Sequence, residues 1–169
     1  TAFDSLSFIK SIPNLEWLEL HELKNLKELD GIEFAKGLKG FIISGGMFGK
    51  QKLKDFEPLS KLADLEYLGL SSTYVQSENL SPLCQLNKLK YLDLPTYYQM
   101  IEYAKIYKNL PNCDHGIKSY RETGLKCKNC GSNTIIPMKK GGREFCPECN
   151  PQKLLDLEEE FDRLLKNCP

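Results

Sequence analysis

The chain has 169 residues, and its hydrophobic content of 41% is that of an ordinary folded globular protein. Its 23 basic and 23 acidic residues give a formal net charge of zero, which excludes a strong overall attraction to nucleic acid or to an anionic membrane. No apolar run approaches the length of about 18 residues that a membrane-spanning helix needs, so no membrane partner is expected.

The first two thirds of the chain repeat one pattern, Leu-x-x-Leu-x-Leu, with other apolar residues allowed at the Leu positions. It appears as LEWLEL, LKGFII, LEYLGL and LKYLDL, starting at residues 15, 38, 65 and 89, so successive copies are 23, 27 and 24 residues apart. A further copy starts at Cys113 and then decays. Because a strand alternates its side chains, each copy predicts a short strand, and stacked copies share one apolar core.

The segments between these strands also have a pattern. FEPLSKLADL and LSPLCQLNKL repeat Leu at every third position and are expected to close each turn on the convex side, while residues 97–109 have the apolar spacing of a true helix. The long second copy, with its segment GGMFGKQKLKDF, is expected to bulge outward. No polar capping unit precedes the first copy, so either further repeats precede residue 1 or the first half-repeat serves as the cap.

Together these copies resemble the leucine-rich-repeat family, most closely its short-repeat, internalin-like bacterial class, over roughly residues 3–118. The resemblance implies an α/β solenoid with a parallel sheet on its concave face, and protein or other ligand binding on that face. The chain departs from the family at the position of the usual asparagine ladder, where Thr73 alone is a common substitute among Leu23, Gly46, Thr73 and Tyr97. Irregular hydrogen bonding is therefore expected in the loops.

The outward strand positions form columns when the copies are aligned. The third position holds mostly ring side chains, namely Trp17, Gly40, Tyr67, Tyr91 and His115, and the fifth includes Glu19 and Asp93. Such a row would supply rigid anchors for a partner. Alternatively, the rings only stabilise the sheet, by about 0.2–1 kcal/mol per neighbouring pair. With His21 added, the candidate partner-binding residues are Trp17, Glu19, His21, Tyr67, Tyr91, Asp93 and His115.

Two further patterns bear on this face. The second position alternates in sign through Glu16, Lys39, Glu66, Lys90 and Asp114, which predicts a cross-strand charge ladder. His21 and His115 are the only histidines, and no Ser or Cys nucleophile stands at a defined spacing from either. The sequence therefore predicts a protein that is not an enzyme and has no small-molecule substrate.

Four of the seven cysteines form the motif C-x2-C-x15-C-x2-C, made of Cys127, Cys130, Cys146 and Cys149. Two such knuckles can aim four thiolates at one ion, which predicts one structural zinc, with iron or a dithiol switch as alternatives. Gly131 follows the first knuckle, where a left-handed turn is needed. An odd cysteine count with two close pairs favours a metal over disulfides, and hence a reducing, cytoplasmic location.

Between the knuckles, NTIIPM and REFC predict two strands joined by KKGG. This part resembles the zinc-ribbon family over about residues 125–150. Four thiolate ligands close the shell, which argues against metal-bound water and hydrolysis. Residues 118–150 carry seven basic and three acidic side chains, and the hairpin tip holds the candidate nucleic-acid contacts Lys139, Lys140 and Arg143, although no aromatic residue is there to stack bases.

The tail places five apolar residues on one helical face: Leu154, Leu157, Phe161, Leu164 and Cys168. We expect a helix that folds back on the ribbon or the last repeat, with docking to a partner helix or self-association as alternatives. The predicted domains are a repeat solenoid at 1–118, a zinc ribbon at 125–150 and a helix at 151–169, the ribbon capping the solenoid. The expected function is protein–protein interaction; the alternative is a nucleic-acid-associated regulator that uses the basic hairpin.

Overall fold

A computed structural model of the chain describes residues 3–46 and 49–168. It has a mixed α/β fold with a parallel sheet and a C-terminal helix, which confirms these parts of the predicted class. The chain divides into two compact units. The first unit consists of Thr1–Pro95 and Asn109–Gly116, and the second of Thr96–Lys108 and Ile117–Pro169. Neither helix of the described residues is long and apolar enough to cross a bilayer.

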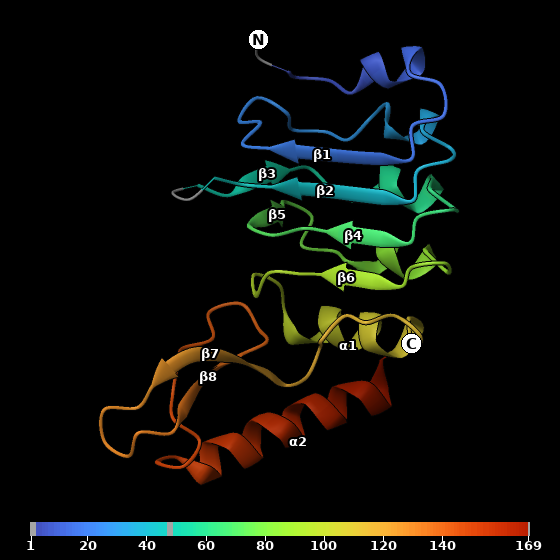
Figure 1. The fold of residues 1–169 in the computed structure, drawn as a ribbon. Helices are drawn as coiled ribbons and strands as arrows, with labels where there is room; N and C mark the ends of the chain where they lie inside the picture. Colours follow the sequence, from blue (N-terminus) through green and yellow to red (C-terminus); the bar gives the residue numbers. More distant parts are fainter. Residues whose placement is uncertain (1–2, 47–48, 169) are drawn as a thin grey trace. The chain divides into compact units, whose positions relative to one another are not determined.

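The first unit is built on a four-stranded parallel sheet in the order β1-β2-β4-β6 (Figure 1). The strands are β1 (Trp17–His21), β2 (Gly40–Ser44), β4 (Tyr67–Gly69) and β6 (Tyr91–Asp93). One strand comes from each complete copy of the sequence pattern, as predicted.

Strand alternation divides the sheet into two faces. Leu18 pairs in register with Phe41, Phe41 with Leu68, and Leu68 with Leu92. The last three side chains are at most 1% exposed, whereas Leu18 on the outermost strand is half-buried because it has a neighbouring strand on one side only. These residues form the inner layer of the apolar core, and the intervening residues point to the opposite face.

A short 3-10 helix precedes each strand of this sheet, where apolar residues recur at every third position: η1 (Ser7–Ser11), η2 (Ile32–Phe34), η3 (Glu57–Lys61) and η4 (Ser81–Gln85). A proline occupies the first turn of η3 and of η4, where its missing N–H has no intrahelical partner to lose. Each helix buries an aliphatic side chain, and consecutive helices contact one another.

A second parallel sheet of two strands, β3 (Gln51–Leu53) and β5 (Thr73–Val75), was not predicted. Gln51 and Thr73 face each other in its register and are both buried. The Gln51 amide donates to the Leu26 carbonyl and the Thr73 hydroxyl to the Ile43 carbonyl, each at 2.8 Å. The predicted outward bulge includes residues 47–48, which lie outside the described residues, but its later part forms β3.

The second unit contains all but the last residue of α1 (Met100–Asn109), together with β7 (Tyr120–Lys126), β8 (Asn133–Pro137) and α2 (Pro151–Asn167). Both helices were predicted, and Pro151 begins α2 as expected. The apolar face of α2 buries Leu157 and Phe161, and the Phe161 ring meets the Tyr107 ring of α1 edge to face, with centroids 6.0 Å apart. Helix α2 therefore folds back within its own unit, as the tail pattern predicts.

The predicted hairpin is only partly present. NTIIPM forms β8, but its antiparallel partner is β7, from the segment YRETGLK ahead of the first knuckle. REFC contributes a single bridge between Phe145 and Ile135. The β7 segment lacks the apolar alternation that marks a strand, and it pairs through a bulge at Gly124, whose φ of +75° an alternating pattern does not reveal.

Candidate functional site

The four motif cysteines converge on one point. Their sulfur atoms all lie within 4.8 Å of one another. The distance is 3.8 Å from Cys127 to Cys149, 3.4 Å from Cys130 to Cys146 and 3.5 Å from Cys130 to Cys149. A tetrahedral shell with Zn–S bonds of about 2.3 Å has edges of about 3.8 Å, so the cluster is positioned to hold one metal ion.

Local backbone hydrogen bonds shape the two knuckles. The Gly131 N–H donates to the Cys127 carbonyl at 2.9 Å, and Gly131 adopts the predicted left-handed conformation with φ of +78°. In the second knuckle the Asn150 N–H donates to the Cys146 carbonyl at 3.1 Å, one residue before α2 begins. Each pair of sulfurs is thus directed by a turn that the spacing of two residues makes possible.

The sulfur cluster is electrostatically unfavourable without a cation. Hydrogen bonds from the Ser132 hydroxyl and backbone lower the pKa of the Cys130 thiol to about 6. In contrast, contact with the other sulfurs, that of Cys130 first, raises the pKa of the Cys149 thiol to about 12. Four adjacent thiolates can coexist only if a bound cation offsets their repulsion, and soft sulfur ligands of this kind select zinc, iron or Cu(I).

A second feature is a row of aromatic rings on the outward face of the four-stranded sheet. Trp17, Gly40, Tyr67 and Tyr91 follow one another in register across β1, β2, β4 and β6. The Tyr67 and Tyr91 rings are stacked, with centroids 4.6 Å apart and an interplanar angle of 12°. The Trp17 centroid is 5.3 Å from that of Tyr67. We call Trp17, Tyr67 and Tyr91 the aromatic row.

Gly40 makes this row continuous. A Cβ atom at Gly40 would lie 1.9 Å from Cε3 and 2.1 Å from Cζ3 of Trp17, so the indole ring covers the space that any other side chain would fill. The ring thereby crosses β2 and contacts Tyr67 on the strand beyond. The sequence aligned the four residues in one column but did not reveal that the indole ring occupies the space that a side chain in place of the glycine would fill.

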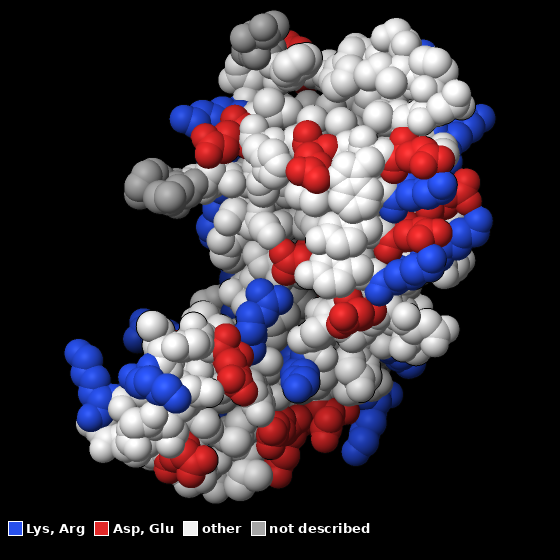
Figure 2. Space-filling view, in the orientation of Figure 1, with Lys and Arg blue, Asp and Glu red and all other residues white. Residues whose placement is uncertain are grey.

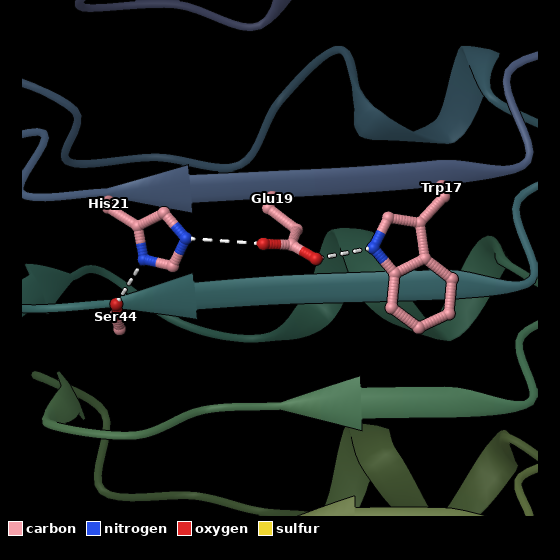
Figure 3. A network of polar contacts seen from close by, with 4 residues as sticks. All are labelled: Trp17, Glu19, His21 and Ser44. Carbon is pink, nitrogen blue, oxygen red and sulfur yellow. Dashed lines mark hydrogen bonds and ion pairs between the residues drawn. The ribbon is translucent and has the colours of Figure 1, made fainter.

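A polar network lies beside the row (Figure 3). The Trp17 indole N–H donates to Oε1 of Glu19 at 2.7 Å, Nε2 of His21 lies 3.4 Å from Oε2 of Glu19, and Nδ1 of His21 lies 2.7 Å from the Ser44 hydroxyl. The hydrogen bonds from Trp17 and then His21 lower the pKa of Glu19, so this carboxylate stays charged. The structure thus joins Trp17, Glu19 and His21, three of the predicted partner-binding residues.

Ser44 was missed because the parallel register, not sequence spacing, places it opposite His21. Ser44, His21 and Glu19 have the composition of a nucleophile–base–carboxylate triad, but they do not form an enclosed site. The side chains of His21 and Glu19 are 56% and 47% exposed, and neither Ser44 nor His21 lines the cavity of about 610 Å³ that Glu22, Gly45 and Gly46 border. Triads act where substrate and water are controlled, and this group is open to solvent.

The predicted charge ladder beside the row is confirmed for two pairs. Lys39 Nζ lies 2.8 Å from a Glu16 carboxylate oxygen, and Lys90 Nζ lies 2.6 Å from one of Glu66. Asp93, at the far end of the sheet, accepts the Ser71 hydroxyl. Figure 2 shows acidic groups on both sides of the uncharged strip that covers the strands, and on one side they alternate with basic groups.

His115 does not take the predicted place in the row. Tyr91 forms a parallel bridge with Asp114, one residue earlier than the aligned repeats imply. A shift of one residue moves a side chain to the opposite face of a sheet. His115 is half-buried, and burial lowers its pKa although neighbouring Asp114 acts in the opposite direction.

One of the three basic residues of the predicted hairpin tip is paired with an acidic side chain. Lys139 Nζ pairs with a Glu160 carboxylate oxygen of α2 at 2.6 Å. Lys140 and Arg143 are both exposed. The positive charge available to a nucleic acid is therefore smaller than the sequence count suggests.

A lysine-rich cavity was also missed. The volume of about 610 Å³ mentioned above is lined partly by Lys24, Lys27, Lys50 and Lys52. These lysines come from the loops after β1 and β2 and from β3, segments that the repeat pattern does not align with one another.

Comparisons of the chain with protein-family models and with curated proteins find no match, so its function has to be inferred from its own residues.

Proposed function

We propose that this chain is a non-enzymatic leucine-rich-repeat protein that binds a protein partner on the outward face of β1, β2, β4 and β6. Membership of the repeat family is supported by copies 23, 27 and 24 residues apart that each supply one strand to the same parallel sheet. A bacterial, cytoplasmic origin remains part of this proposal, based on the same resemblance and on the cysteine pattern.

The observation that carries the binding function is the aromatic row. Rigid aromatic side chains dominate the energetics of protein interfaces, and those left exposed on a folded surface are available to a partner. Trp17 is 49% exposed and Tyr91 38%, although both belong to an ordered stack. A row that only stabilised the sheet would not need an exposed indole held over a glycine by a hydrogen bond to Glu19.

The test is replacement of Trp17, Tyr67 and Tyr91 by Ala. A partner is first isolated from the native source, then purified, and its dissociation constant is measured by calorimetry. We expect each substitution at the interface centre to weaken binding by about 30-fold, the effect of a hot spot of about 2 kcal/mol. Circular dichroism checks that each variant remains folded.

Phe34→Ala is the matched control, because Phe34 is 47% exposed but lies on η2, outside the strands. Binding that tolerates loss of the aromatic row, or that is weakened as much by Phe34→Ala, would contradict the proposed interface.

We further propose that the four cysteines hold one structural zinc ion. The sulfur distances of 3.4–3.8 Å support a tetrahedral four-thiolate shell, which zinc accepts without an open coordination position. Zinc would supply no catalytic chemistry there; the chain's own residues would use it to hold both knuckles together. Metal analysis by mass spectrometry should find one zinc per chain, and Cys127→Ser should abolish stoichiometric binding. A different metal at full occupancy would refute the assignment.

A further inference from the structure

We infer that the partner segment bound by the aromatic row carries positive charge in the form of arginine side chains. This inference rests on the proposed function and specifies the chemistry of the occupant. It follows from two properties of the same face, its open ring surfaces and the carboxylates around them.

The rings offer the first half of a cation site. Cations bind over aromatic faces within about 6 Å of the ring centroid, and tryptophan is the strongest acceptor. The chain already makes such contacts elsewhere: Lys10 Nζ lies 4.3 Å from the Phe34 centroid and Lys153 Nζ 4.2 Å from the Phe145 centroid. Trp17 and Tyr91 are the two ends of the aromatic row and also its most exposed rings.

Carboxylates stand at both ends of the row. Glu19 is bonded to the Trp17 indole N–H and therefore lies at the edge of that ring. At the other end, Asp93 lies two residues after Tyr91 on β6 and therefore on the same face of the sheet, and Asp114 forms a parallel bridge with Tyr91. A cation resting on either terminal ring would thus meet a negative charge.

The basic residues of the face do not offset this potential. The second, third and fifth positions of the repeats together hold the five acidic residues Glu16, Glu19, Glu66, Asp93 and Asp114 against two lysines, Lys39 and Lys90, which leaves a formal charge of −3. Both lysines are already paired, with Glu16 and Glu66 respectively. The remaining negative charge lies along the aromatic row, where a cationic segment would approach.

Arginine fits this arrangement better than lysine. Its planar guanidinium can stack on a ring and still direct two N–H groups to a carboxylate, whereas an ammonium is a compact and strongly hydrated charge. Glu19 is held beside Trp17 by hydrogen bonds from Trp17 and His21, so its acceptor is already oriented before a ligand arrives. A neutral aromatic-rich partner or an acidic one would gain nothing from this placement.

The test is fluorescence polarisation with a labelled short peptide of alternating glycine and arginine, compared with peptides in which lysine, glutamine or glutamate replaces the arginine. We expect the arginine peptide to bind at least about tenfold more tightly than the glutamine peptide, and more tightly than the lysine peptide. Trp17→Ala should weaken it about threefold to fivefold, the effect of one exposed cation–π contact.

Glu19→Gln removes one charge but keeps an oxygen for the indole N–H, and it should weaken the arginine peptide about threefold to tenfold. Glu57→Gln is the matched control: it removes the same charge from an exposed site on η3 and should change nothing. Equal affinity for the glutamine and arginine peptides, or equal effects of Glu19→Gln and Glu57→Gln, would overturn the inference. The proposed function would survive either result if the purified partner still requires the aromatic row.

Discussion

Replacing Gly40 with Ala tests whether the indole of Trp17 is seated as described. The new Cβ would lie 1.9 Å from Cε3 of the ring, whereas unstrained carbon atoms approach to about 3.5–4.0 Å. The ring edge must therefore move by about 1.6 Å or more, out of its contact with Tyr67 and out of line with Glu19. The substitution adds only one methyl group, yet it should break both the ring contact with Tyr67 and the hydrogen bond to Glu19.

The size of the effect can be worked from these losses. An aromatic pair contributes about 0.5–1.5 kcal/mol and a hydrogen bond about 0.5–1.5 kcal/mol. These losses are partly offset, because replacing a glycine within a strand by alanine stabilises the folded state by about 0.5–1 kcal/mol. We expect the free energy of unfolding to fall by about 0–1.5 kcal/mol, because the exposed hydrogen bond lies at the lower end of its range.

Fluorescence is the direct assay, because Trp17 is the only tryptophan of the chain. Its emission should shift to longer wavelength in Gly40→Ala as the ring moves into water, and urea titration gives the change in stability. Gly37→Ala is the control, since a Cβ there meets no atom within 4 Å. Unchanged emission together with a gain in stability, the usual result of replacing a strand glycine, would refute the seating of the ring on Gly40.

Three further outcomes follow from the described contacts. Chelation or Cys127→Ser should abolish cooperative thermal unfolding of the second unit, since structural zinc contributes about 10–16 kcal/mol of apparent binding energy. An unchanged melting curve after complete metal removal would contradict a structural role. If the ribbon caps the repeats as predicted, the first unit should also lose thermal stability. Thr73→Val leaves the buried Ile43 carbonyl without its hydroxyl donor and should cost about 1–3 kcal/mol in urea unfolding; a cost near zero would count against that bond. Because burial lowers the pKa of His115 in the folded protein, the unfolded chain protonates this imidazole at a higher pH, so the free energy of unfolding should decline as pH falls below about 6.5. The substitution His115→Gln should reduce that decline. If the stability of the variant and of the original protein changes with pH in the same way, His115 is not responsible.

The features that could be predicted from the sequence are those encoded by local spacing. Leu-x-x-Leu-x-Leu marks a strand because two apolar residues of each strand must face the core, and all four complete copies became strands of one sheet. The cysteine spacing indicated the candidate metal ligands because a knuckle is a local turn. Helix α2 was visible for a similar reason, since its apolar residues recur with the helical period.

Pairings between distant segments could not be read in this way. Strand β7 has no periodic apolar pattern and exists because β8 supplies its partner, while the sheet of β3 and β5 depends on buried hydrogen bonds from Gln51 and Thr73. Likewise the last bridge joins Tyr91 to Asp114, which removes His115 from the aromatic row by a shift of one residue.

The same distinction applies to the candidate binding face. The sequence alone determined which residues share a column, because strand alternation and repeat spacing are local properties. Only the tertiary structure decided that the Trp17 indole lies over Gly40 to reach Tyr67, and that Ser44 completes the network of His21 and Glu19. Both depend on the contact of side chains from different strands, and that contact exists only after the parallel sheet has formed.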